Sequence, residues 1–165
     1  MKVKCGENYY EIEQIIDQYH VMLFRLSFVR MKNKEDAEDV VQDTFLRLLQ
    51  QINNGKTFEN EEHLKAWLLT VCSNRGKSIL TTVWNKRTEG LDSVKEMVAP
   101  EEKTDYALES VMQLPEKYRT AITLFYYEQL STEQIASIMK TKPATVRSYL
   151  HRGREKLKKL LEEDA

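Results

Sequence analysis

Long apolar runs, glycine, proline and cysteine are all scarce in this chain of 165 residues. It has five glycines, three prolines and two cysteines, and its net charge is only -1. Cys5 and Cys72 are far apart in the sequence, so neither a disulfide framework nor a zinc site is indicated, and both are expected as free thiols. No apolar stretch reaches the length of a signal peptide or a membrane span. We therefore expect a cytoplasmic protein with no membrane insertion.

Apolar residues recur at intervals of three and four along most of the chain, and this spacing predicts helices. One helix is expected over 9–31, beginning at Tyr9. A second follows the capping residue Asn33 and ends near Gly55, and a third starts at Asn60 and runs towards Trp84. No segment alternates convincingly enough to predict a strand. The expected fold class is all-α.

A break in this periodicity divides the chain into two parts. Between residues 87 and 105 the apolar spacing fails, and Gly90 and Pro100 appear. We expect two small helical domains, residues 1–87 and 106–165, joined by a flexible linker at 88–105. The second domain should contain a helix that starts at Pro115.

The end of the chain has the layout of a helix-turn-helix. Ser131 and Gln134 form a capping-box pattern that opens a short helix, a three-residue turn follows, and Pro143 starts a longer helix. Residues 140–159 contain eight Lys or Arg residues against one acid. A solvated helix end needs only two or three cations, so this excess favours DNA binding. The side chains expected to face a DNA major groove are Thr145, Arg147, Ser148, His151 and Arg152.

Acidic residues gather instead on the second predicted helix. An acidic first helical turn explains Glu35 and Asp36 well, but it explains the acids that follow less well. Those later residues, together with two apolar side chains expected to be exposed, could dock on a basic partner helix, and both interpretations stay open. The set consists of Asp39, Gln42, Asp43, Phe45 and Leu46.

The third predicted helix mixes amide, cationic and aromatic side chains, a combination that binds single-stranded DNA through stacking and phosphate contacts. Alone this signal is weak, because Trp67 and Trp84 are more often core residues than stacking platforms. The set consists of Asn74, Arg75, Lys77, Trp84, Asn85, Lys86 and Arg87.

From Tyr9 to Leu161 the chain resembles sigma factors of the extracytoplasmic function (ECF) class. Three segments carry the resemblance in order and spacing: DAEDVVQDTFLRLLQQI (36–52), LKAWLLTVCSNRGKSIL (64–80) and LPEKYRTAITLFYYEQLSTEQIASIMKTKPATVRSYLHRGREKLKKLL (114–161). In that family they correspond to the regions that grip the clamp helices of the largest polymerase subunit, capture the -10 element and read the -35 element. The chain departs from the family pattern at Gly76, Ser78 and Lys140.

The resemblance implies an RNA polymerase sigma factor that recognises -10 and -35 promoter elements. Its partners would be promoter DNA and the polymerase core, through the clamp helices and the flap, and the sequence leaves open an anti-sigma partner. The implied polymerase contacts are Asp39, Gln42, Asp43, Phe45 and Leu46. The implied -10 contacts are Asn74, Lys77, Lys86 and Arg87, and the implied -35 contacts are Thr145, Arg147, Ser148, His151 and Arg152.

Other classes of function are less well supported. An independent DNA-binding regulator would need a sensing domain, and the N-terminal half lacks the alternation of strands and helices that a receiver domain needs. A helical protein that sequesters polymerase without reading DNA is a third class, and alanine at Arg147 and Arg152 would distinguish it, because this change abolishes promoter use only if DNA is read. An enzyme is not indicated, because His20, His63 and His151 are widely separated and no phosphate-binding loop occurs. No catalytic residue, cofactor or metal site is predicted.

Overall fold

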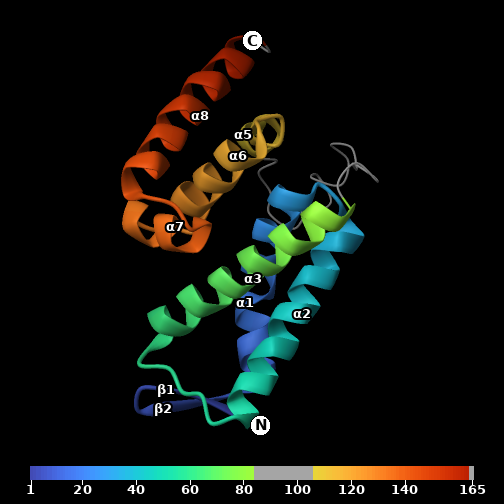
Figure 1. Cartoon of the computed structure of the whole chain (residues 1–165), viewed down its shortest axis with the longest axis vertical. Coiled ribbons are helices and arrows are strands. Elements are labelled where there is room, and N and C mark those ends of the chain that lie inside the picture. The colour runs from blue at the N-terminus through green and yellow to red at the C-terminus, as the bar shows by residue number, and fades with distance from the viewer. Residues whose placement is uncertain (84–105, 164–165) are drawn as a thin grey trace.

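The computed structural model consists of two helical domains and one small β-hairpin (Figure 1). It describes residues 1–83 and 106–163, with the backbone alone at 77–83, 106 and 107. The expected linker at 88–105 lies outside these residues. The first domain contains β1 (Lys2–Cys5), β2 (Asn8–Glu11), α1 (Ile12–Met31), α2 (Lys34–Asn53) and α3 (Glu61–Val83). The second contains α5 (Tyr106–Val111), α6 (Glu116–Ile122), the π-helix η1 (Thr123–Tyr127), α7 (Thr132–Met139) and α8 (Pro143–Glu163).

Polar caps set the starts of α2 and α3 where the sequence predicts them. The Asn33 side chain accepts a hydrogen bond of 2.9 Å from the Asp36 amide. The Asn60 side chain accepts one of 2.8 Å from the His63 amide. Each bond satisfies an amide that has no partner within its helix, so these two boundaries follow from local chemistry.

The prediction that the chain has no strand is wrong at its N-terminus. β1 and β2 pair antiparallel, from Lys2 opposite Glu11 to Cys5 opposite Asn8. Gly6 turns the chain at φ +61°, where an added Cβ would lie 2.9 Å from the Glu59 carbonyl oxygen. β1 does alternate between exposed and buried side chains, but only over four residues, which is too short a pattern to separate from chance. The first helix consequently begins at Ile12 rather than at Tyr9.

The second domain follows the predicted caps and turns closely. Ser131 and Gln134 form the expected capping box, with reciprocal hydrogen bonds of 2.9 and 3.1 Å. Lys140 ends α7 in the left-handed region, at φ 56° and ψ 49°. A lysine therefore takes the backbone conformation that glycine usually supplies at such a turn. Pro115 caps α6, and the predicted helix continues through η1 to Tyr127.

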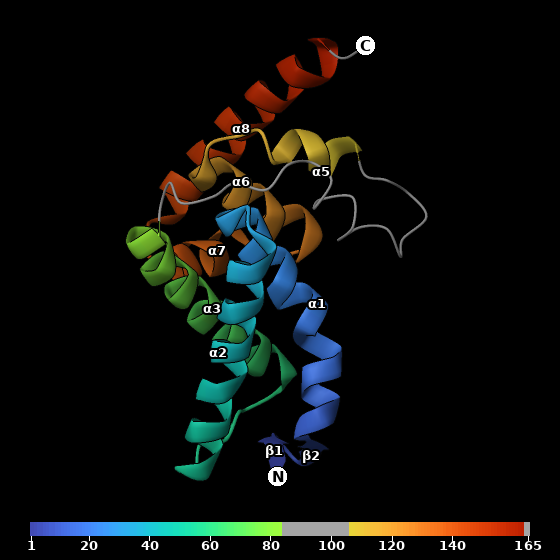
Figure 2. The ribbon, with the colours of Figure 1, turned by 90° about the vertical axis from the view of Figure 1, so that its right-hand side faces the viewer.

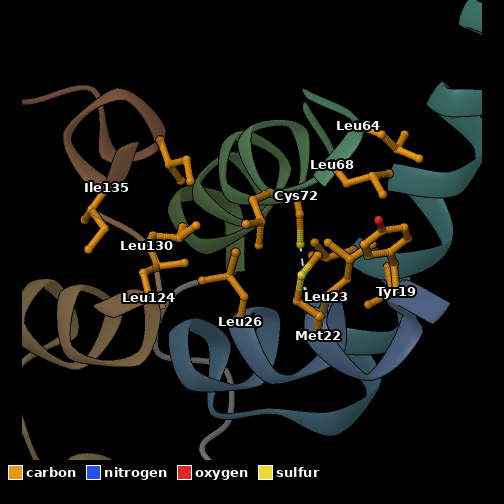
Figure 3. Packing of buried hydrophobic residues seen from close by; sticks show 14 of the residues in the cluster. Tyr19, Met22, Leu23, Leu26, Leu64, Leu68, Cys72, Leu124, Leu130 and Ile135 are labelled. Carbon is orange, nitrogen blue, oxygen red and sulfur yellow. Dashed lines mark hydrogen bonds between the residues drawn. The ribbon is translucent and has the colours of Figure 1, made fainter. Parts of the chain in front are cut away.

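The two domains pack against each other, with α6 on α1 and α7 on α3 (Figure 2). One apolar cluster runs through both domains, and Figure 3 shows Leu26 of α1 gathered with Leu124, Leu130 and Ile135 of the second domain. A smaller cluster also joins them. It consists of Phe28, Val29, Ala37, Leu108 and Met112.

Candidate nucleic-acid and polymerase interfaces

α7 and α8 form the helix-turn-helix through a buried apolar contact. Ile135 and Ile138 of α7 are buried, as are Val146 and Leu150 of α8. The four residues share one side of the motif because their spacing is helical. The opposite side of α8 is therefore turned outwards.

This outward side of α8 presents the residues that the sequence predicts for the -35 element. Arg147, His151 and Arg152 are exposed, whereas Thr145 and Ser148 are half-buried. Lys140 and Lys142 flank the turn and are exposed as well. A convex basic helix face that begins at a tight turn fits the dimensions of a major groove.

An acidic side chain at the start of α7 lies near this basic face. Glu133 has a lowered pKa, first because its own backbone amide donates a hydrogen bond to it and then because Thr132 does the same. Arg147 contributes to the shift through its charge. The carboxylate therefore stays ionised at the N-terminus of α7, where it interacts electrostatically with Arg147, a predicted DNA contact.

A close crossing of α6 and α8 fixes the angle of the basic helix. Gly153 is buried at this crossing, and a Cβ added there would lie 2.5 Å from Cδ1 of Ile122. One residue further on, Nε of Arg154 donates a hydrogen bond of 2.6 Å to the Tyr126 hydroxyl, and its guanidinium lies over the rings of Phe125 and Tyr126. These contacts were not predicted from the sequence, where the only signal was a glycine inside a long predicted helix.

The predicted polymerase contacts divide between the outer and inner sides of α2. Asp39 and Gln42 are exposed, and Leu46 is 54% exposed. Asp43 is half-buried and accepts a hydrogen bond of 2.6 Å from Nε of Arg75, on α3. The expectation that Phe45 is exposed is wrong. It is 7% exposed, because it lies on the same helical stripe as Val41 and Leu48 and belongs to the core.

The predicted -10 contacts are described only in part. Asn74 is exposed on α3. The side chain of Lys77, and Lys86 and Arg87 altogether, lie outside the described residues. Trp67 is half-buried and meets Phe58 edge to face at 5.8 Å between ring centroids, so it serves as a core residue.

Three arginines join the two domains, and none was predicted to do so. Arg119 of α6 is 6% exposed and donates hydrogen bonds to the Val29 and Arg30 carbonyl oxygens at the end of α1. Burial lowers the pKa of Arg119. Its buried guanidinium is stabilised by hydrogen bonds to three carbonyl oxygens, the third of which belongs to Leu114. A cation here also complements the dipole of α1.

The other two arginines form ion pairs across the same interface. Nε of Arg30 is 2.8 Å from the Glu116 carboxylate, and its Nη1 donates to Ser73, next to Asn74. Nη1 of Arg25 is 2.7 Å from the Glu128 carboxylate, which is largely buried. These pairs were missed because their partners are 86 and 103 residues apart in the sequence.

Polar side chains of both domains also line a small pocket that includes the pair of Arg30 with Glu116. It has a volume of about 180 Å³. Its lining includes Ser73 and Asn74 of α3 together with Lys140 and Thr141 of the helix-turn-helix turn. Asn74, a predicted -10 contact, and the turn that precedes the predicted -35 recognition helix therefore line the same pocket.

Comparison with known proteins identifies the family. The Sigma-70 region 2 family matches residues 15–84, and the Sigma-70 region 4 family matches residues 104–157. The ECF RNA polymerase sigma-E factor of Haemophilus influenzae is 31% identical over 144 residues, which are 76% of this chain and 75% of the relative. This chain belongs to the ECF family of RNA polymerase sigma factors. It is thus a subunit for promoter recognition, a regulatory role rather than an enzymatic one.

Further similarities agree with membership in the ECF sigma factors. The factor SigW of Bacillus subtilis is 29% identical over 89% of this chain and 87% of its own length. Two solved structures share the fold at 21% identity with a TM-score of 0.66, each over 93% of this chain. They are CnrH in complex with the cytosolic domain of CnrY, covered over 89%, and the sigma factor RpoE of Bartonella quintana in complex with the anti-sigma factor NepR, covered over 98%. Among the described helices of this sigma factor, none is both long and apolar enough to span a membrane.

Proposed function

We propose that this ECF sigma factor reads the -35 element with α8, holds the polymerase core through α2, and contacts the melted -10 element with α3. The exposed basic face of α8 is the observation that carries this proposal. Phosphate neutralisation by Lys and Arg supplies much of the affinity for duplex DNA, and the side chains that reach base edges supply sequence preference. Arg147 and Arg152 have the exposure and the chemistry for both tasks.

The polymerase contact is proposed for the outer side of α2. Asp39, Gln42 and Leu46 follow one another at helical spacing, so their exposed side chains share one face. Asp43 borders this face through its ion pair with Arg75. Phe45 is a core residue beneath this face, so its side chain is not available to a partner. An acidic face with one apolar side chain suits a basic clamp helix.

The assignment to two promoter elements also gives the proposed domain boundaries. Residues 1–87 would serve the polymerase clamp and the -10 element through Asn74, Lys77, Lys86 and Arg87. Residues 106–165 would serve the -35 element and the polymerase flap, and 88–105 would join the two. The chain would act in the cytoplasm with no catalytic step of its own. An anti-sigma factor is a further proposed partner, supported by the complex that RpoE forms with NepR.

Transcription in vitro with purified core polymerase tests this proposal. Added protein should direct promoter-specific starts on fragments of the source genome, and mapping those starts would reveal both elements. Alanine at Arg147 and Arg152 together should abolish promoter use but leave core binding unchanged. Alanine at Lys158 and Lys159, two exposed cations at the far end of α8, is the control of equal charge change.

The same experiment separates the competing functions. A regulator that acts without polymerase would bind its operator tightly with no core enzyme present. A sequestering protein would bind core but would direct no starts, and the alanine substitutions on α8 would then change nothing. Absence of promoter-specific starts on every fragment would contradict the proposed function.

A further inference from the structure

The pocket of about 180 Å³ between the two domains has no role in the function proposed above. Its lining comes from α1, α3, α6, α7, α8 and the turn that joins the last two helices. The charged residues of this lining are three cations and one acid, namely Arg30, Lys117, Lys140 and Glu116. The pocket therefore carries an excess of positive charge, and the ligand that suits it is an anion.

The single acid of the pocket already has two partners. The Glu116 carboxylate lies 2.8 Å from Nε of Arg30, and it also accepts a hydrogen bond of 3.2 Å from the Thr120 hydroxyl. The positive charge that remains belongs to Lys117 and Lys140, and neither ammonium group forms an ion pair with another described residue. An anion in the pocket would therefore meet two cations whose charge is still available.

Aromatic rings hold the Lys117 ammonium group beside the pocket. Its Nζ lies 5.7 Å from the ring centroid of Tyr149, which lines the pocket, and 5.3 Å from that of Tyr118. The two rings meet edge to face at 5.8 Å between centroids. A cation that lies over a ring keeps its full charge, whereas a cation paired with a carboxylate is neutralised. Lys117 is therefore oriented without losing its attraction for an anion.

Lys140 belongs to the turn of the helix-turn-helix. It ends α7 in the left-handed region, at φ 56° and ψ 49°. Glycine is the usual residue in this conformation, so a lysine here places its backbone in a sparsely populated region. Backbone strain of this kind is retained where the residue has a use. A side chain that contributes charge to the pocket supplies such a use.

The size of the pocket and its donor groups restrict the class of anion. Pockets for drug-sized ligands have volumes of about 300–1,000 Å³, so a pocket of about 180 Å³ leaves no room for a whole nucleotide. Asn74 and Thr141 add an amide and a hydroxyl donor to the two ammonium groups. A phosphate group offers close to two negative charges and several acceptor oxygens, which matches this set of donors. A carboxylate offers one charge and two oxygens.

We propose that this pocket binds a small phosphate anion, with Lys117 and Lys140 as charged contacts and Asn74 and Thr141 as hydrogen-bond donors. The anion would contact both domains, because Asn74 belongs to the first domain and the other three residues to the second. Free phosphate fits better than a phosphate of the DNA backbone, which carries a sugar on each side. The site goes beyond the proposed function and does not depend on it.

Titration of the full chain with inorganic phosphate at constant ionic strength tests the site. Isothermal titration calorimetry should show one phosphate bound per chain, and the urea midpoint should rise with phosphate because the ligand binds the folded chain. The double variant Lys117→Gln, Lys140→Gln should bind phosphate at least about tenfold more weakly, since it removes two charge-assisted contacts. Lys142→Gln is the matched control, because Lys142 is exposed on the same turn but does not line the pocket.

A second variant tests the pocket without changing its charge. Thr141→Tyr places a bulky side chain in the lining and should abolish phosphate binding, with helicity by circular dichroism equal to that of the wild-type chain. If this variant bound phosphate as tightly as the wild-type chain, the anion would lie elsewhere and the inference would be overturned.

The remaining outcomes are equally decisive. Equal affinity in the wild-type chain and the double lysine variant, or an equal loss in Lys142→Gln, would overturn the inference, because phosphate would then bind the exposed cations of the basic helix in general. Absence of binding at millimolar phosphate would overturn it as well. In a parallel titration with oligothymidylate, a loss of binding in the double variant without a loss of phosphate binding would assign the pocket to DNA instead. No step measures transcription, so failure of this site and failure of the proposed function are separate results.

Discussion

Replacing Gly153 with alanine should destabilise the helix-turn-helix, although alanine is the better helix former. The added Cβ would lie 2.5 Å from Cδ1 and 3.3 Å from Cγ1 of Ile122, and 3.4 Å from Cβ of Tyr118. Rotation of the terminal methyl alone would not remove the crowding, because Cγ1 of Ile122 and Cβ of Tyr118 also lie within 3.4 Å. Overpacking of this kind costs about 1–3 kcal/mol, whereas the change from glycine to alanine contributes up to about 1 kcal/mol in favour of the helix. The net loss should therefore reach about 2 kcal/mol.

Gly76 offers a matched control inside the same protein. It is also a buried helical glycine, but the nearest atom to an added Cβ there is Nη1 of Arg30, at 4.0 Å. Alanine at position 76 should meet no clash and should stabilise α3 by up to about 1 kcal/mol. The two substitutions are chemically identical and are expected to have opposite signs.

Urea unfolding followed by circular dichroism would measure both effects as changes in midpoint at constant slope. Binding of a -35 duplex, followed by fluorescence anisotropy, would show whether Gly153→Ala also tilts α8 away from its DNA-binding angle. If Gly153→Ala proved as stable as Gly76→Ala, the close crossing would not constrain α8, and the reasoning about its fixed angle would be refuted.

Three further predictions concern the proposed interfaces and the core. Alanine at Arg147 or Arg152 should weaken binding to promoter duplex. It should also lower the slope of log affinity against log salt by about one for each phosphate that the variant no longer neutralises. An unchanged slope would exclude a phosphate contact by that arginine. Leu46→Ala should reduce core binding in a pull-down without changing stability, whereas Phe45→Ala should cost about 3–5 kcal/mol in urea unfolding; equal effects on stability would contradict their different burial. Burial raises the pKa of the Cys72 thiol from 9.0 to about 11, so the unfolded chain loses this proton first. The stability this thiol provides is complete below pH 9 and falls by about 2–3 kcal/mol towards pH 11, and Cys72→Ala should flatten that fall.

Local chemistry is the part of this fold that the sequence predicts well. The caps at Asn33, Asn60 and Ser131 each depend on residues three positions away, and all three appear where expected. At Lys140, where the sequence departs from the family pattern, the lysine itself accepts positive φ. The hairpin was missed because four residues on each strand carry too little periodicity, and the further bridge of Cys5 to Phe58 joins residues that are distant in the sequence.

The interdomain contacts could not have been predicted in the same way. Arg25, Arg30 and Arg119 lie on predicted helices whose other faces are apolar, so each cation is expected in solvent by default. They are buried only because the second domain packs on the first. The local sequence around each arginine gives no indication of that packing. Phe45 shows the converse, because it was expected to be exposed towards a partner, while the helical stripe that it shares with Val41 and Leu48 buries it.

The charged character of the interface bears on how easily the two domains can separate. A buried ion pair contributes little net stability, because its attraction is offset by the loss of hydration, and that hydration returns when the pair is exposed. An interface built partly from Arg25, Arg30 and Arg119 is therefore less costly to open than an apolar one of the same size. The apolar residues that remain, such as Phe28 and Met112, would be uncovered on opening.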